Sequence, residues 1–517
     1  MNGAQSLLRT LVAAGVDVCF ANPGTSEMHF VAALDSVPEM RPVLALFEGV
    51  VTGAADGFAR MADKPAATLL HLGPGLTNGL ANVHNARKAG TPMLNIVGDH
   101  ATYHRQYDAP LTSDVEGLAR PLSHWTKTTR SPLDLAADAA QAVAAARTPP
   151  GRIATLILPA DVSWSEAGEP ARALPVPAPT KVDEAAVRAA ASALQRGEKA
   201  VILMNGTALR ERGLLLGSRI ANTTSARLMC DTFTSRLERG AGRATIERLP
   251  YFAEMALGEL QDVKHLVLIG AQAPVAFFAY PGKPNYLVPD GCTVHVLARP
   301  EEDAIDALER LAERVSAARD AATIQAPSRP AEPTGKIDAR TLGEAIGAHL
   351  PEHAIVVDEG NTEGFLVPLF TAGAPAHDWL SNTGGSIGIG LPLAVGAAVA
   401  CPQRKVVCLD GDGSAMYTIQ ALWTMAREQL NVVNLILTNH SYRILNIELQ
   451  RVGAESAGER ARGLLDIGRP ELDFVALAEG MGVPATRVDS AEALCQELAR
   501  AMQTKGPSLI EVVMHHG

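Results

Sequence analysis

Residues 405–418 read KVVCLDGDGSAMYT, and residues 432–439 read VVNLILTN. Each stretch begins as a short apolar run, which is typical of a strand buried on both faces of a parallel sheet. The first run leads into Asp412 between two glycines, and the second ends at Asn439, 27 positions later (439 − 412). Ligands of such sheets bind beyond the carboxyl ends of the strands, so these two residues are the first candidates for a site.

The residues at these strand ends suit a magnesium ion and a phosphate. Mg²⁺ takes oxygen ligands, and Asp412 offers a carboxylate, Asn439 an amide oxygen and Ser441 a backbone carbonyl. Gly411 and Gly413 permit a tight turn that brings backbone N–H groups close to a diphosphate. The pattern therefore predicts a site for Mg²⁺ and a phosphorylated cofactor.

Two plainer interpretations apply to the first motif. An EF-hand loop that begins at Asp410 would need Glu at its twelfth position, where Ala421 stands, so this alternative fails. A plain β-turn after a strand remains possible for the motif taken alone. The matching Asn at the end of the next strand favours the metal site.

The rest of the chain alternates short apolar runs with helix-like stretches, which predicts parallel sheets joined by right-handed crossovers. Two proline-rich segments, residues 168–180 and 325–335, are typical of linkers. We therefore predict three doubly wound α/β domains with parallel sheets, over residues 1–167, 181–324 and 336–517.

The composition excludes several classes of protein. Hydrophobic residues are 47% and charged residues 20%, which is too apolar for a disordered chain, and the net charge of −11 argues against a nucleic-acid binder. No run of about 18 apolar residues predicts a membrane span, and no export signal is visible. The six cysteines form no C-x-x-C pair, so we interpret them as small buried residues of a cytoplasmic protein, not as a disulfide frame or a zinc site.

The pair of G-D-G-S and a following Asn resembles the cofactor motif of the thiamine diphosphate enzymes, which include acetolactate synthase, pyruvate decarboxylase and benzoylformate decarboxylase. The resemblance covers the whole chain, in the order pyrimidine-binding, central and diphosphate-binding domain. It implies thiamine diphosphate and Mg²⁺ as cofactors, with Asp412, Asn439 and the Ser441 carbonyl as metal ligands. It also places three residues at the cofactor: Gly413, Ser414 and Tyr442.

A second segment, LFEGVVTGAADGFAR (46–60), resembles the glutamate helix of that family and places Glu48 at the catalytic position. There the carboxylate would hydrogen-bond the aminopyrimidine of the cofactor and promote deprotonation of its thiazolium ring. The plainer interpretation is a surface Glu that begins a helix and interacts with the helix dipole. The diphosphate motif favours the catalytic role.

Two other segments of the first domain resemble the family. FANPGTSE (20–27) is similar to its G-x-P-G-[ST] loop and places Thr25 near the substrate. LLHLGPGLTNGLANV (69–83) is similar to its glycine-rich turn, with Asn78 close to the cofactor. His71 stands where benzoylformate decarboxylases carry an active-site histidine, and it would move protons there; a histidine in an ordinary strand-end hydrogen bond is the alternative.

Two segments of the third domain, VVDEGNTEG and NTGGSIGIGLP, resemble loops that contact the cofactor. The first implies Asn361 and Thr362 as donors to the diphosphate. In the second, the Gly385 carbonyl would meet the aminopyrimidine and Ile387 would separate the two rings. Close packing of a glycine-rich helix on a sheet is the alternative for this second segment.

The sequence departs from genuine acetolactate synthases in three places. It has Asp99 and His100 where they carry a glutamine, it lacks their Phe and Gln in residues 108–112, and it has no tryptophan after Asn439. The middle domain also has no G-x-G-x-x-G, which makes FAD doubtful.

The match to benzoylformate decarboxylase is also incomplete. Ala279 stands near the position of its central-domain histidine. We interpret Phe277 and Phe278 as core residues in preference to an apolar acceptor pocket, and Glu448 as a solvated helix residue in preference to a substrate-pocket carboxylate.

The resemblance implies a 2-oxo acid decarboxylase or carboligase that forms an enamine, which is then protonated or added to a carbonyl acceptor. The active site would lie at the interface of a homodimer or homotetramer. True acetolactate synthesis from pyruvate is the alternative within the family, and a non-catalytic regulator that binds thiamine diphosphate is the alternative from another class. The sequence leaves open the 2-oxo acid, the acceptor and a regulatory subunit.

Overall fold

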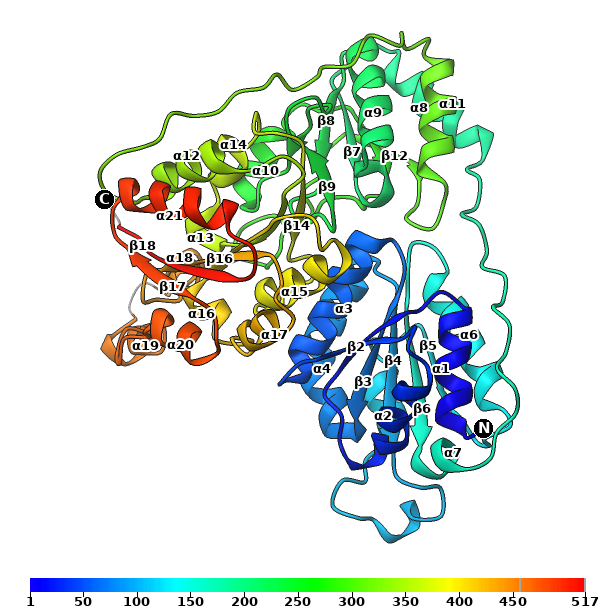
Figure 1. Cartoon of the computed structure of the whole chain (residues 1–517). Helices are drawn as coiled ribbons and strands as arrows, with labels where there is room; N and C mark the ends of the chain where they lie inside the picture. Colours follow the sequence, from blue (N-terminus) through cyan, green and yellow to red (C-terminus); the bar gives the residue numbers. More distant parts are fainter. Residues whose placement is uncertain (455–456, 516–517) are drawn as a thin grey trace.

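Three β-sheets organise the computed structural model, which describes residues 1–454 and 457–515 (Figure 1). Within these described residues, every strand pair of the three sheets is parallel except the pair of β9 and β14. The predicted α/β class with three parallel sheets is confirmed. None of the described helices combines the length and the apolar character that a membrane span requires.

The first sheet contains six strands, and apolar side chains cover both of its faces. In sheet order the strands are β2 (Arg41–Leu44), β1 (Val18–Ala21), β3 (Ala66–His71), β4 (Met93–Asp99), β6 (Ile153–Pro159) and β5 (Trp125–Thr128). Its α-helices are α1 (Gly3–Ala13), α2 (Met28–Ala33), α3 (Glu48–Ala62), α4 (Leu72–Ala89), α5 (Val115–Ala119), α6 (Leu135–Arg147) and α7 (Ala160–Trp164).

Alternate residues of these strands point to opposite faces, as strand geometry requires. On β1, Phe20 packs on the face that α3 and α4 cover, whereas Cys19 packs on the face that α1 and α6 cover. The inner strands β1, β3, β4 and β6 are buried on both faces and largely apolar, whereas the edge strands β2 and β5 are partly exposed.

The second sheet contains five strands, ordered β10 (Glu247–Arg248), β8 (Arg227–Cys230), β7 (Ala200–Met204), β11 (His265–Ile269) and β12 (Thr293–Ala298). Its α-helices are α8 (Glu184–Leu194), α9 (Glu211–Thr224), α10 (Ala253–Glu259) and α11 (Ala304–Arg314). Figure 1 shows extended segments on either side of this sheet, one from α7 to α8 and one from α11 to α12. They coincide with the two proline-rich stretches of the sequence.

The third sheet contains seven strands, ordered β17 (Ala485–Val488), β18 (Ser508–Val513), β16 (Val432–Thr438), β15 (Val406–Gly411), β13 (Ile355–Glu359), β14 (His377–Ser381) and β9 (Leu237–Arg239). The first α-helices of this part are α12 (Ala339–His349), α13 (Asn361–Gly364), α14 (Val367–Phe370), α15 (Gly390–Ala400) and α16 (Asp412–Ala415). The others are α17 (Ala421–Arg427), α18 (Arg443–Arg451), α19 (Glu459–Gly463), α20 (Phe474–Gly480) and α21 (Ala491–Gln503). Strand β9 comes from the chain between the linkers and pairs antiparallel with β14, so the predicted middle domain contributes a strand to the third sheet.

Helices α3 and α15 pack against each other and join the first and third sheets (Figure 1). A Cβ atom on Gly57 would lie 2.1 Å from the Leu393 carbonyl oxygen, and one on Gly396 would lie 1.9 Å from the Ala54 carbonyl oxygen. Only glycine permits this approach of the two backbones. The contact fixes how the ligand-binding edges of the two sheets are oriented within one chain.

Candidate functional site

The carboxyl ends of β15 and β16 bring Asp412 and Asn439 together. The two strands are neighbours in the sheet, and the buried Asp412 is the first residue of α16. Its Oδ2 accepts hydrogen bonds from the backbone N–H groups of Asn439 at 2.9 Å and His440 at 2.7 Å. Burial raises the pKa of the Asp412 carboxyl, and these backbone donors oppose that shift.

Glu363 holds the Asn439 side chain and was not predicted from the sequence. Its Oε1 accepts from Asn439 Nδ2 at 2.9 Å and from Arg443 Nη1 at 2.8 Å. Because the amide nitrogen of Asn439 is engaged in this way, its Oδ1 is directed toward the loop, where it accepts from the Ser441 N–H at 2.9 Å. The sequence pointed to Glu363 only through its position in the VVDEGNTEG segment, which resembles a loop that contacts the cofactor.

The loop after β16 carries the other predicted residues. His440 has a left-handed backbone with a φ of 56°, and after this turn the Tyr442 ring lies beside Gly413 of α16. A Cβ atom on Gly413 would lie 2.5 Å from the ring of Tyr442, so glycine is required at that position. The loop and α16 therefore form one cradle, which contains Asp412, Gly413, Asn439, Ser441 and Tyr442.

The end of β13 lies beside this cradle. Asn361 Nδ2 donates to Ser414 Oγ at 2.9 Å, which joins the two loops predicted to contact a diphosphate. Asn361 is exposed and Thr362 is half-buried at the start of α13.

The glycine-rich loop of residues 382–388 is held by a residue of the first domain. Asn85 on α4 donates from Nδ2 to the Ser386 carbonyl at 2.8 Å, and its Oδ1 accepts from the Ser386 N–H at 3.1 Å. Gly385 is exposed with a φ of 77°, and Ile387 is half-buried. Asn85 was not singled out from the sequence, because its partner lies 301 positions away.

Glu48 begins α3 at the edge of the first sheet. Its side chain is buried, and its Oε2 accepts a hydrogen bond from Asn78 Nδ2 at 3.0 Å. Gly75 lies against it, since a Cβ atom there would come within 3.3 Å of Glu48 Oε1. Two residues predicted from separate motifs are therefore in contact.

His71 forms a hydrogen bond with a carboxylate that the sequence analysis did not single out. Its Nδ1 lies 2.8 Å from Oε2 of the fully buried Glu27, and the same oxygen accepts from the Gly24 N–H at 2.7 Å. A Cβ atom on Gly24 would meet the His71 ring at 2.3 Å, and one on Gly98 would meet Glu27 Oε1 at 1.6 Å. These two glycines make room for the pair, whereas the neighbouring Thr25 is exposed.

The two groups of residues are carried by different sheets of the chain. Among residues 1–454 and 457–515, no hydrogen bond or ion pair joins Glu48, His71 or Asn78 to Asp412, Asn439 or Asn361. The chain thus presents one set of polar groups on the first sheet and another on the third.

Models of one protein family match both ends of the chain. The model described as the thiamine pyrophosphate enzyme N-terminal TPP binding domain matches residues 1–124, and the model of the C-terminal TPP binding domain matches residues 358–512. The Mycobacterium tuberculosis protein IlvX, which carries the provisional name acetolactate synthase large subunit, is 58% identical over 520 residues and 99% of both chains. The chain belongs to the thiamine pyrophosphate enzymes.

One further relative agrees with this assignment, and one solved structure has the same fold. The benzoylformate decarboxylase of Pseudomonas aeruginosa is 29% identical over 531 residues, which cover 96% of each chain. The solved structure of a thiamine diphosphate-dependent 4-hydroxybenzoylformate decarboxylase from Rhodococcus jostii superposes with a TM-score of 0.87 over the whole of both chains, at 24% identity. This thiamine pyrophosphate enzyme therefore belongs to the branch that contains acetolactate synthases and 2-oxo acid decarboxylases, as the sequence motifs indicated.

The cradle fits the metal and the diphosphate that enzymes of this family are expected to hold. Asp412 Oδ2 accepts from two backbone N–H groups and Oδ1 from one, so Oδ1 keeps a lone pair for a cation. The donor set of carboxylate, amide and carbonyl oxygens suits Mg²⁺, and Gly413 leaves room for the ring of Tyr442 beside it.

The middle part of this thiamine pyrophosphate enzyme contradicts two expectations. Phe277 and Phe278 are 47% and 58% exposed, so the core interpretation was wrong; Phe277 packs edge-on against Phe233. Glu448 on α18 is not solvated, because it accepts a hydrogen bond from Tyr280 Oη and its side chain is only 14% exposed. Tyr280 covers the Glu448 side chain of α18, which the local sequence pattern did not indicate.

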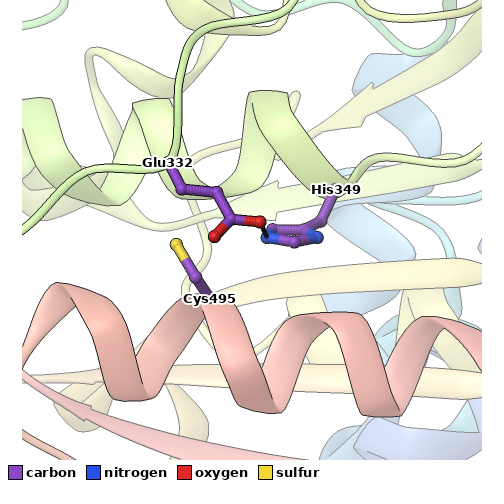
Figure 2. A group of neighbouring side chains, drawn as sticks. All are labelled: Glu332, His349 and Cys495. Atoms are coloured by element: carbon purple, nitrogen blue, oxygen red, sulfur yellow. Dashed lines mark ion pairs between the residues drawn. The ribbon is translucent and has the colours of Figure 1, made fainter.

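Figure 2 shows another group of potential metal ligands, Glu332, His349 and Cys495, whose ligand atoms all lie within 4.8 Å of one another. Burial raises the pKa of the Cys495 thiol to about 11, so it is protonated at neutral pH. Glu332 of the second linker lies 3.3 Å from His349 on α12, a contact that fastens the linker to the third domain. Cys292 and Cys401 are only half-buried, which corrects the prediction that all six cysteines are buried.

Proposed function

We propose that this enzyme is a Mg²⁺-dependent decarboxylase or carboligase of 2-oxo acids, and that its active site is completed by a second copy of the chain. The observation that carries the proposal is the pairing of Glu27 with His71 on the same edge of the first sheet as Glu48. A non-catalytic binding protein has no need of a buried carboxylate that orients an imidazole.

Asp412, Asn439 and the Ser441 carbonyl would hold Mg²⁺, while Ser414, Asn361 and Thr362 would contact the diphosphate. The hydrogen bonds that join these loops support the assignment, because they hold the oxygen donors before any ligand arrives. Thiamine diphosphate, when bound, supplies the electron sink that allows a 2-oxo acid to release CO₂.

Glu48 would hydrogen-bond the aminopyrimidine of the cofactor. Its burial and the hydrogen bond from Asn78 fix the direction of the carboxylate, so one oxygen is held while the other remains available. The Gly385 carbonyl and the Ile387 side chain would contact the cofactor from the third domain.

His71 would move the proton that the product requires. Glu27 accepts from Nδ1, and the proton on Nδ1 directs the lone pair of Nε2 away from the carboxylate. Nε2 would then exchange a proton with the substrate, and Thr25 at the same loop would contact the substrate carboxylate.

A homodimer would join the two groups, which different sheets of the chain carry. In such a dimer the first sheet of one chain would face the third sheet of its partner, and Glu48 and Asp412 of different chains would lie at opposite ends of one cofactor. The exposure of Asn78, Asn361 and Gly385 in the single chain supports this arrangement, because a partner chain would cover them.

The substrate test compares pyruvate, 2-oxobutyrate, benzoylformate and a branched 2-oxo acid with the protein supplied with thiamine diphosphate and Mg²⁺. CO₂, aldehyde and acyloin are measured separately for the wild type and for His71→Ala. Aldehyde and CO₂ that depend on His71 support a decarboxylase, and acetolactate from pyruvate alone supports a synthase. Cofactor binding without CO₂ from any substrate would contradict an enzyme of this kind.

A further inference from the structure

A cavity of about 310 Å³ lies between the second and third sheets, away from the proposed catalytic residues. Its walls come from β8, β9 and β10 on one side and from α14 and β14 on the other. None of its lining residues is among the residues assigned to the cofactor, the metal or the substrate. In volume it resembles the smaller ligand pockets of proteins, which begin at about 300 Å³.

Two arginines line this cavity with little negative charge to balance them. Arg239 on β9 donates from Nη2 to the Pro368 carbonyl at 2.5 Å, and its guanidinium lies 5.1 Å from the centre of the Trp379 ring. No carboxylate of the described residues forms an ion pair with it. Burial, together with the nearby Arg248, lowers the pKa of Arg239 to about 10, so it remains charged at neutral pH.

Arg248 on β10 has only slightly more negative charge beside it than Arg239 has. It donates from Nε to the Thr232 carbonyl at 2.6 Å, and its sole carboxylate neighbour among the described residues is Asp358, at 3.8 Å. Two guanidinium groups therefore share one carboxylate beside a cavity. Both arginines are only partly shielded from water, and the Arg248 side chain is still 33% exposed. An anion in the cavity would supply the negative charge that this arrangement lacks.

The other walls are largely apolar. Leu237, Ile246, Leu369, Ala372 and the ring of Trp379 surround the space in front of the arginines. Such a lining matches a ligand with one charged end and an apolar body. We propose that the cavity binds a small organic anion, a carboxylate or a phosphate ester, whose charged group lies between Arg239 and Arg248.

A short path of contacts connects this cavity with the proposed diphosphate loop. The carboxylate of Asp358 lies near Arg248, and its Oδ2 also accepts a hydrogen bond from Trp379 Nε1 at 3.1 Å. Its Oδ1 accepts from the N–H of Gly360 at 3.2 Å, directly before Asn361. An anion that draws Arg248 toward the cavity changes the charge balance at Asp358, which positions this loop. The proposed coupling depends on the proposed cofactor site, whereas the proposed anion site does not.

Binding is tested by calorimetry on the full chain without cofactor, with phenyl phosphate as the probe. We expect saturable binding of one molecule per chain. Arg239→Met and Arg248→Met should each weaken it roughly tenfold or more, because each removes a charged hydrogen-bond donor. Arg319→Met, an exposed arginine elsewhere, should bind the probe like the wild type.

Ala372→Phe retains both arginines and fills the cavity, and it should abolish binding even if an arginine variant fails to fold. Asp412→Ala tests whether the probe binds in the cofactor cradle instead of the cavity. If the probe binds in the cavity, this variant should bind it like the wild type. The proposal is overturned by non-saturable binding, by full binding to Ala372→Phe, or by loss of binding in Asp412→Ala.

The coupling is tested by the affinity for thiamine diphosphate with and without the probe. We expect a change of about fivefold or more in the wild type and none in Asp358→Asn, although that variant still binds the probe. An equal change in both chains would show that Asp358 does not transmit the effect. If thiamine diphosphate does not bind at all, the proposed function is contradicted. The anion site is then judged by the calorimetry with phenyl phosphate alone.

Discussion

Glu27 Oε2 lies 2.8 Å from Nδ1 of His71, at the carboxyl ends of neighbouring strands β1 and β3. The carboxylate is fully buried, and the Gly24 N–H and the Ser26 hydroxyl also donate to it. An ionised carboxylate can only accept, so the proton of the imidazole is held on Nδ1. The pair therefore selects one tautomer of His71 and fixes the direction of the ring.

Replacing Glu27 by Gln tests this role. The amide is similar in shape but also presents N–H donors, so His71 loses its preference for the Nδ1–H tautomer. We expect kcat to fall about 10²-fold, within the range for general acid–base groups, while the Kd for thiamine diphosphate is unchanged. Steady-state kinetics and calorimetry measure the two quantities. An equal loss in cofactor binding would instead show that Glu27 only supports the fold.

The metal assignment predicts a different outcome for Asp412→Ala. Without this carboxylate, the backbone N–H groups of Asn439 and His440 lose their acceptor and Mg²⁺ loses its charged ligand. We expect Mg²⁺-dependent binding of thiamine diphosphate to be abolished in calorimetry. The exposed Asp35→Ala serves as the control and should bind the cofactor normally. Undiminished binding to Asp412→Ala would refute the cradle.

Glu48→Gln should separate binding from turnover. The amide retains the size of the side chain and its contact with Asn78, but it cannot accept a proton. We expect the cofactor to bind and kcat to fall about 10²-fold or more. Calorimetry and CO₂ release are measured on the same preparation, and normal turnover of an identified substrate would exclude Glu48 as the activating group.

The sequence predicted the fold, and it named residues that the structure brings together, because strand ends carry local patterns. Apolar runs that end in Asp412 and Asn439 are visible within a few residues, and adjacent parallel strands place their ends side by side. The contacts that support these residues are not local. Glu27 meets His71 from 44 positions away, and Asn439 meets Glu363 from 76 positions away.

Burial was also difficult to predict where distant segments cover a surface. Phe277 and Phe278 are apolar, yet they lie in a loop whose partners leave them exposed. Glu448 is charged, yet Tyr280 from another part of the chain covers it. Glycines carried a usable signal, since Gly24 and Gly98 lie where the Glu27–His71 pair leaves no room for a side chain.

Asp231 in the middle part predicts a pH dependence of stability. Burial raises the pKa of its carboxyl to about 7, and Asn205 Nδ2 donates to it at 2.5 Å. An unfolded Asp titrates near 3.9, so between about pH 4 and 7 the folded state binds more protons and the free energy of unfolding falls as the pH rises.

Asp231→Asn removes this titration and retains an acceptor for Asn205. We expect the free energy of unfolding of Asp231→Asn minus that of the wild type to be about 4 kcal/mol larger at pH 8 than at pH 4. Denaturant unfolding at the two pH values measures this quantity. If the variant and the wild type differ by the same free energy of unfolding at both pH values, burial does not raise the pKa of the Asp231 carboxyl.

The shared active site predicts recovery of activity when two inactive chains are mixed. Glu48→Gln damages the part contributed by the first sheet, and Asp412→Ala damages the part contributed by the third sheet. In a dimer that contains one chain of each kind, one of the two sites combines an intact Glu48 with an intact Asp412. Random reassociation makes about half of the dimers mixed, so we expect about a quarter of the wild-type activity. Each variant mixed with itself is the control, and a mixture that stays inactive after proven exchange of chains would place both residues in sites built by a single chain.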